Sequence, residues 1–253
     1  YWPNGYLDFK RTNIKFEFIF DADHNILDDS NLYPKDKVCL EKLLKEISGK
    51  SRLVVCASKS MLDWFKENGA KKTFRLRNGI DLSRFAVRKQ NKPERFTVVY
   101  CGILSNWVDY DLLKRVVERN PDIDFVIIGK PFLNNNYREL GDYSNVYLWG
   151  EKSADEVAEL LPGFHAGLGF YIKDPFLDGD SMKIYEYLAA GLPVVCTRYH
   201  SSLQEDFNGL LFLGESFSEF NKNLQDIKAG KLYLDKERVD AFLENATWEK
   251  RIS

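Results

Sequence analysis

The sequence predicts an α/β fold with largely parallel sheets. Short apolar runs of strand length alternate with helical stretches along most of the 253 residues, which is typical of βα units. Several runs, among them LVVC, VVYC and PVVC, contain no polar residue, as parallel strands covered on both faces require. With 44% hydrophobic and 29% charged residues, the chain resembles ordinary globular proteins and can bury a core.

Eight strands are expected, with five helices between them, in the order that repeated βα units require. Apolar runs place the strands at residues 15–21, 53–57, 73–77, 96–101, 124–129, 145–150, 166–171 and 193–197. Apolar residues that recur every three or four positions place the helices at residues 35–46, 59–67, 110–119, 154–161 and 182–190.

A polar and charged stretch at residues 81–93 has a proline and no apolar period, so it predicts a domain boundary. The three strands before it are too few for a complete Rossmann-like domain, so a partial domain is expected over 1–85. The five strands after it predict a complete Rossmann-like domain over 86–234. A final amphipathic helix over 235–253 carries Val239, Phe242 and Leu243 on one side and is expected to pack back on the first domain.

Charge and cysteine usage exclude several classes of protein. A net charge of -2 argues against nucleic-acid binding, because phosphate backbones are held by clustered positive charge, and any phosphate site must therefore be local. The four cysteines, Cys39, Cys56, Cys101 and Cys196, lack metal-ligand spacing, and buried reduced thiols are expected.

Targeting signals are absent from the sequence. No run approaches the roughly 18 apolar residues that span a bilayer, and no signal-peptide pattern opens the chain, so a cytoplasmic location is expected. The opening YWPNGYLDFK reads as the continuation of a longer chain. Its aromatic and basic residues leave two alternatives, a solvated segment or peripheral contact with the inner face of a membrane.

The stretch DPFLDGDSMKIYEYLAAGLPVVCT predicts an anion site, because a polar loop leads into a short helix that stops at Gly191. Asp180 or Ser181 is expected to cap this helix. Lys183 lies in its first turn, where the ammonium, the helix amides and the helix dipole can converge on one anion. Glu186 shares that face, so the lysine suits a diphosphate and the carboxylate suits a ribose diol. The alternative is a surface helix with one solvated i,i+3 pair.

A second candidate is the strand FTVVYC, which ends at Gly102 before a loop and a helix. A glycine there lets a phosphate approach the backbone and the start of the next helix. The full G-x-G-x-x-G fingerprint is absent. The alternative is an ordinary tight turn between strand and helix.

The segment IFDADHN places Asp21, Asp23 and His24 at the end of the first strand. Either aspartate, if buried, or the histidine is a candidate general base for an acceptor hydroxyl. A turn cluster that caps a helix is the alternative. Metal chelation by the three side chains lacks a fourth ligand, so no metal site is predicted.

Together these motifs resemble the C-terminal half of the GT-B glycosyltransferases. The resemblance rests on NGID followed by Arg84 and Phe85, the strand that ends at Gly102, IIGKP, NVYLWG, EYLAAGLPVV and NGLLF, which stand in that family's order. It covers roughly residues 21–251, and EYLAAGLPVV is its most specific part. It implies a GT-B type fold with a complete C-terminal and a partial N-terminal Rossmann-like domain.

The resemblance also implies a donor site at the carboxyl ends of the second sheet. Lys183 would hold the diphosphate and Glu186 the ribose of a nucleotide-diphosphate sugar. Asp178 and Glu186 have the eight-residue spacing of the two glutamates in retaining members, with aspartate in the first place. The remaining implied donor contacts are the loop from Gly102 to Asn106 near the phosphates or sugar, Gly150, Glu151 and Lys152 near the base, and Ser181 near the sugar. Such enzymes use lysine and helix amides in place of a metal or other cofactor.

Lys183 three residues before Glu186, together with the W-x-D motif at Trp107–Asp109, resembles transferases of teichuronic acid and xanthan-type polysaccharide assembly. This implies a hexosyltransferase that moves sugar from a donor such as a UDP-sugar to a glycan or lipid-linked acceptor. Two alternatives remain open: a sugar-nucleotide 2-epimerase, and a nucleotide-sugar-binding module without independent activity.

Overall fold

The chain folds as two compact units, each with its own parallel sheet, which confirms the α/β prediction. The first unit comprises Tyr1–Asn78 and Asp174–Asp180, and the second comprises Gly79–Lys173 and Ser181–Ser253. The structure is a computed structural model, and it describes residues 17–22, 34–85, 90–131, 136–173 and 180–253.

The first unit has a three-stranded parallel sheet in the order β1-β2-β3. Its core consists of apolar residues from the sheet and two helices, including Phe20, Ile47, Val54 and Phe65. The strands are β1 (Ile19–Ala22), β2 (Leu53–Cys56) and β3 (Thr73–Arg75), and the helices are α2 (Pro34–Lys50) and α3 (Lys59–Glu67).

The second unit has a six-stranded parallel sheet in the order β6-β5-β4-β7-β8-β9. Five of these strands were predicted; the sixth, β9, was not, because it is only three residues long and contains a glycine. The strands are β4 (Thr97–Cys101), β5 (Asp124–Ile128), β6 (Val146–Gly150), β7 (Ala166–Gly169), β8 (Val194–Thr197) and β9 (Phe212–Gly214).

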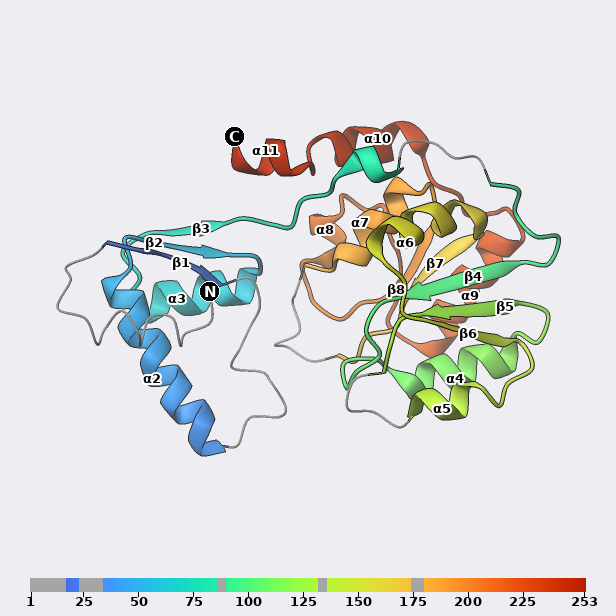
Figure 1. Ribbon diagram of the computed structural model, residues 1–253, viewed down its shortest axis with the longest axis horizontal. Helices are drawn as coiled ribbons and strands as arrows, with labels where there is room; N and C mark the ends of the chain where they lie inside the picture. The colour runs from blue at the N-terminus through green and yellow to red at the C-terminus, as the bar shows by residue number, and fades with distance from the viewer. Residues whose placement is uncertain (1–16, 23–33, 86–89, 132–135, 174–179) are drawn as a thin grey trace. The chain divides into compact units, whose positions relative to one another are not determined.

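Helices cover both faces of this sheet, so the unit has two apolar layers. Figure 1 shows α4 and α5 on one face, and α6 and α7 on the other. Within the described ranges no helix is both long and apolar enough to cross a membrane. The helical segments are η2 (Leu82–Phe85), α4 (Tyr110–Arg119), α5 (Asn136–Leu140), α6 (Ala154–Leu160), η3 (Leu161–Gly163), α7 (Met182–Ala189), α8 (Leu203–Asp206) and α9 (Phe217–Lys228).

The strand order makes this unit doubly wound. From β4 the chain moves outward through β5 to β6, then returns to β7 on the other side of β4 and continues to β9. The direction of winding therefore changes between β4 and β7. In such sheets ligands bind outside the carboxyl ends of the strands at this change of direction.

The C-terminal segment forms two helices rather than the single helix predicted, α10 (Lys236–Glu244) and α11 (Trp248–Ile252). The interruption arises because Thr247 caps the second helix, its side chain accepting a hydrogen bond from the Lys250 amide at 3.3 Å. The apolar stripe of Val239, Phe242 and Leu243 is buried as expected. Both helices belong to the second unit, and α10 packs on α7.

None of the four cysteines, all of which lie in described parts of the chain, forms a disulfide bond. Cys56, Cys101 and Cys196 are buried in strands, as expected from the apolar runs that they end. Cys39 is exposed on α2, so the expectation of burial was wrong for this residue.

Candidate functional site

Three neighbouring strands end in glycine at the carboxyl edge of the second sheet, and we call Gly102, Gly129 and Gly150 the glycine edge. Their φ angles are 147°, 144° and 70°, a region that side chains disfavour. A Cβ atom on Gly129 would overlap the carbonyl oxygen of Gly102, so the two backbones lie in contact. The amides of Gly102 and Gly129 donate to the carbonyls of Ile128 and Gly150, both at 2.8 Å. The edge therefore offers close approach to the backbone rather than free amide donors.

Tyr187 anchors α7 to the sheet and so determines where Lys183, one turn earlier, lies. The hydroxyl of Tyr187 accepts a hydrogen bond from the Cys101 amide at 2.7 Å. Its ring lies where a Cβ on Gly167 would be, so only glycine fits there. Lys183 consequently reaches over the end of β4, where Nζ and Cε lie 2.7 Å from the position of a Cβ on Gly102. The predicted proximity of Lys183 and Gly102 is confirmed.

Two tyrosines surround the ammonium group of Lys183. Its Nζ donates to the Tyr100 hydroxyl at 3.2 Å and lies 4.5 Å from the centroid of that ring. It also lies 4.9 Å from the centroid of the Tyr171 ring. Burial lowers the pKa of Lys183, but the oxygens of Tyr100 and Tyr171 outweigh burial and hold the pKa above its usual value. The half-buried lysine is therefore charged at neutral pH.

Glu186 lies at the same edge as Lys183. Burial raises the pKa of the Glu186 carboxyl, and the charges of Lys183 and Arg84 act in the opposite direction. Burial and the nearby Glu186 charge together raise the pKa of the Cys101 thiol to about 12. Glu186 therefore lies close to Lys183 and the end of β4.

Lys183 and Glu186 do not form the solvated i,i+3 ion pair that the sequence left as an alternative. Neither side chain forms an ion pair with any residue in the described part of the chain. By contrast, Arg84 pairs with Asp81 at the same spacing, with 3.4 Å between Nε and Oδ2. Lys183 and Glu186 thus differ from Arg84 and Asp81 in remaining unpaired at this spacing.

The start of α7 is open, and the predicted capping by Asp180 or Ser181 was wrong. Ser181 is the N-cap residue, but its hydroxyl lies 2.6 Å from the Tyr171 hydroxyl and makes no capping hydrogen bond. Asp180 instead accepts hydrogen bonds within the first unit, from Arg77 Nη2 at 2.8 Å and the Asn78 amide at 2.6 Å. The Ile184 amide donates to the Ser181 carbonyl at 3.2 Å, and the Met182 and Lys183 amides find no acceptor among the described residues. Open helix starts attract anions.

The start of α4, by contrast, is occupied. The Asp109 side chain accepts a hydrogen bond from the Leu112 amide at 2.9 Å and caps the helix with a carboxylate. This carboxylate competes with a phosphate for the helix amides, and the expected approach of a phosphate to this helix start from Gly102 stays a prediction. Asn106 is exposed in the loop before α4.

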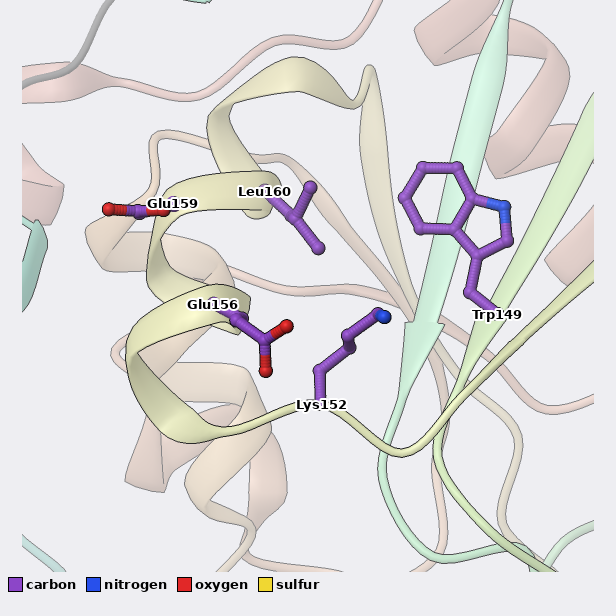
Figure 2. A pocket seen from close by; sticks show the side chains of 5 residues that line it. All are labelled: Trp149, Lys152, Glu156, Glu159 and Leu160. Atoms are coloured by element: carbon purple, nitrogen blue, oxygen red, sulfur yellow. The ribbon is translucent and has the colours of Figure 1, made fainter.

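The turn after β6 continues the glycine edge through Gly150. Glu151 Oε1 forms an exposed ion pair with Lys130 Nζ at 2.9 Å. Ser153 and Glu156 form a capping box that fixes the start of α6. Beside the turn lies a hollow of about 540 Å³, into which Figure 2 shows the side chains of Trp149, Lys152 and Leu160 projecting. Its lining residues are Trp149, Lys152, Glu156, Glu159 and Leu160.

The predicted catalytic residues lie in the first unit. Asp21 is exposed on β1, so the burial expected of a general base is absent from its surroundings. Asp23, His24 and the donor-site candidate Asp178 lie outside the described residues. Among the residues that the structure describes, no group of three or more His, Cys, Asp or Glu side chains is placed to hold a metal ion.

Sequence reasoning missed Tyr100, Tyr171 and Tyr187. Each lies within or next to an apolar run, so each resembles an ordinary core residue, and all three are buried. The available signal was the polar hydroxyl, because a buried tyrosine normally directs its hydroxyl to a partner. Here those partners are Lys183, Ser181 and the Cys101 amide.

Comparison with known proteins agrees with this geometry. A family profile described as "Glycosyl transferases group 1" matches residues 95–228, more than half of the chain. The putative teichuronic acid biosynthesis glycosyltransferase TuaH of Bacillus subtilis is 26% identical over 145 residues, covering 53% of this chain and 36% of TuaH. The chain thus spans only about a third of the length of this curated relative.

Solved structures of low sequence identity share the fold. Sucrose-phosphate synthase from Thermosynechococcus elongatus matches with a TM-score of 0.74 and 15% identity, over 99% of this chain and 69% of that protein. Anabaena HepE in complex with UDP and glucose matches with a TM-score of 0.63 and 17% identity, over 93% of this chain and 66% of HepE. A mutant of TarM from S. aureus in complex with Fondaparinux, alpha-GlcNAc-glycerol and UDP also matches. Its TM-score is 0.67 and its identity is 18%, over 99% of this chain and 52% of TarM. These matches establish the two-unit fold of GT-B glycosyltransferases.

Proposed function

Since the chain belongs to the glycosyl transferases group 1 family, we propose that it binds the nucleotide-diphosphate sugar donor of a glycosyltransferase. The donor site lies at the carboxyl edge of the second sheet, around Lys183 and the glycine edge. The sugar passes to a glycan or lipid-linked hydroxyl in polysaccharide assembly, as the name of the relative TuaH and the sugars in the HepE and TarM complexes suggest.

One observation carries this proposal: the Lys183 ammonium lies over Gly102 without a carboxylate partner in the described chain. A half-buried charge is costly unless it is paired, so a site that keeps one unpaired suits a ligand of opposite charge. The open start of α7 adds its amides and the positive end of the helix dipole to the same point. A diphosphate is the group of matching charge, and Lys183 and α7 can neutralise it without a metal.

Glu186 completes the donor site by accepting two hydrogen bonds from the ribose diol. The turn from Gly150 to Lys152 faces the base, and Asp178 and Ser181 line the sugar. In the reaction, the bond between the anomeric carbon and the diphosphate breaks and a bond to the acceptor oxygen forms. The acceptor proton passes to a base, for which Asp21, Asp23 and His24 are the candidates. A lipid-linked acceptor would bring the protein to the inner face of a membrane.

Thermal shift measurements in EDTA test the donor site, with UDP, GDP, ADP and their diphosphate sugars as ligands. A ligand at a hundred times its Kd adds about 2.7 kcal/mol of stability, and we expect this for at least one of them. Lys183→Met should weaken the binding of that ligand about tenfold or more, which is the effect of losing a hydrogen bond to a charged group. Lys222→Met, which removes an exposed lysine on α9, is the control and should have no effect. The proposal fails if no diphosphate stabilises the protein, or if Lys183→Met binds as wild type does.

A binding module without independent activity is the second candidate, because the chain spans only 36% of TuaH. Assays of UDP binding and of UDP-sugar hydrolysis or transfer on one sample separate the two candidates. Binding with turnover supports a transferase, and binding without turnover supports the module.

A further inference from the structure

Tyr100 and Tyr171, which we call the tyrosine cage, flank an ammonium group that no carboxylate in the described chain neutralises. From this arrangement we infer that the tyrosine cage positions Lys183 for the diphosphate and prevents it from pairing with Glu186 before the donor binds. The inference rests on the function proposed above and assigns roles to two residues that contact the lysine rather than the reacting atoms.

The cage is built from both faces of the sheet. Tyr100 belongs to the apolar layer beneath α4, and Tyr171 belongs to the layer beneath α7. Lys183 extends from α7 across Gly102, so its ammonium meets Tyr100 from one layer and Tyr171 from the other. Gly102 is needed for this path, because a Cβ there would collide with the lysine.

Hydrogen bonds fix the orientation of both tyrosines. The Tyr100 hydroxyl donates its proton to the Ile103 carbonyl at 3.2 Å, so a lone pair is left to accept from Lys183. The Tyr171 hydroxyl is held 2.6 Å from the Ser181 hydroxyl at the start of α7. The Tyr171 amide in turn donates to Thr197 Oγ1 at 2.9 Å. Because both rings are buried and held in place, the tyrosine cage is preorganised around the Lys183 ammonium.

A neutral cage differs from a carboxylate in what it leaves for the ligand. The face of a tyrosine ring attracts a cation by about 0.5–2 kcal/mol without cancelling its charge. An ion pair with Glu186 would cancel the charge and would also occupy the carboxylate. Elsewhere in the chain, lysines one turn from an acid do form such pairs, including Lys45 with Glu41 at 2.6 Å and Lys59 with Asp63 at 3.0 Å. The cage therefore keeps the ammonium free for the diphosphate and Glu186 free for the diol.

A double-mutant cycle with UDP and uridine as probes, measured by calorimetry in EDTA, tests this role. Tyr100→Phe and Tyr171→Phe keep the rings and should each weaken UDP binding about three- to tenfold, the effect of one hydrogen bond. Tyr100→Leu also removes the ring and should weaken it tenfold or more. Uridine lacks phosphate, so its affinity should not change. With Lys183→Met already present, the tyrosine changes should alter UDP affinity less than twofold.

Tyr110→Phe and Tyr110→Leu are the matched controls, since Tyr110 is a buried tyrosine in the same layer as Tyr100. Among the described residues, no hydrogen bond or cation–π contact joins Tyr110 to Lys183. They should leave UDP affinity unchanged. The inference is wrong if the tyrosine changes weaken uridine binding as much as UDP binding. It is wrong too if they weaken UDP binding in the Lys183→Met background as much as in the wild-type protein. It is also wrong if both Phe variants and Tyr100→Leu bind UDP as wild type does.

A measurement without ligand separates this inference from the proposed function. Ring currents of Tyr100 and Tyr171 should shift the Hε signals of Lys183 upfield in spectra of protein with 13C-labelled lysine. Lys183→Met identifies that signal by its disappearance, and Tyr100→Leu should return it toward the position of solvent-exposed lysines. A wild-type signal already at that position contradicts the cage, whereas a shifted signal in a protein that binds no UDP contradicts only the proposed function.

Discussion

At the scale of single residues, the site combines an ammonium and a carboxylate that are close but unpaired. Lys183 is kept charged by two tyrosine oxygens, and Glu186 is half-buried without a hydrogen-bond partner in the described chain. Such an arrangement lowers the folding stability of the free protein, and ligand binding restores the lost stability. Functional residues can therefore be recognised here by changes that stabilise the fold and weaken binding.

Glu186→Gln should stabilise the free protein and weaken UDP binding. Burial raises the pKa of Glu186, so the folded state disfavours the ionised form. The resulting loss of stability is absent below the unfolded pKa of about 4.3 and grows as the pH rises through the raised folded pKa. Denaturant unfolding should show equal stabilities near pH 4 and a more stable variant at pH 7, while calorimetry should show binding about tenfold weaker. A variant less stable than wild type at pH 7 would contradict this reasoning.

At the scale of secondary-structure elements, the glycine edge and the start of α7 create the site, while the start of α4 is closed by Asp109. The difference between the two helices lies in their caps. One helix places a carboxylate at its first turn, and the other leaves its amides open beside a lysine. Anion binding should therefore depend on α7 and not on α4.

Gly102→Ala should lower both stability and UDP affinity. The alanine would adopt a φ of 147° and collide with the Lys183 side chain, so we expect a loss of more than about 1 kcal/mol. Gly230→Ala is the control, because Gly230 also has a positive φ of 70° but nothing lies within 4 Å of an added Cβ. Denaturant titration should show that both variants are destabilised. Calorimetry should show weaker UDP binding for Gly102→Ala and unchanged UDP binding for Gly230→Ala. An equal loss of UDP affinity in the two variants would argue against a site at Gly102.

Asp109→Ala should lower the free energy of unfolding by about 1 kcal/mol through loss of the α4 cap. It should not weaken UDP binding, because the α4 start is not part of the anion site. Urea unfolding and calorimetry on the same variant measure the two effects. A tenfold weaker affinity would show that the ligand contacts α4 after all.

At the scale of the whole molecule, the proposed donor site and the proposed catalytic base belong to different units. All the geometry around Lys183, Glu186 and the glycine edge belongs to the second unit, whereas Asp21, Asp23 and His24 belong to the first. Binding and transfer should therefore separate when residues 1–78 of the first unit are removed.

A fragment of residues 79–253, which keeps residues 174–180 of the first unit, should bind UDP within threefold of the full chain and should not transfer sugar. Its six-stranded sheet has apolar layers on both faces, so it retains its own core. Calorimetry and a transfer assay with a UDP-sugar on both proteins check this. A folded fragment that binds no UDP would place an essential part of the donor site in the first unit.

The sequence predicted most of the fold because buried parallel strands appear as unbroken apolar runs. It did not predict β9, which is too short for a periodic signal, or α9, although Ser216 and Glu219 mark its start. The residues at the helix start, Lys183 and Glu186, could be found from local spacing. The contact between Lys183 and Tyr100 spans 83 residues. Asp180 accepts a hydrogen bond from the Asn78 amide, 102 residues away, instead of capping α7, so neither feature follows from local sequence.

The central claim is that a nucleoside diphosphate binds without metal at the glycine edge. A titration of UDP in EDTA into protein with 15N-labelled glycine tests it most directly, because each glycine amide reports its own surroundings. We predict saturable shifts for Gly102, Gly129 and Gly150, with Gly49 and Gly69 of the first unit unchanged. Shifts confined to the first unit, or no shifts at millimolar UDP, would contradict the account.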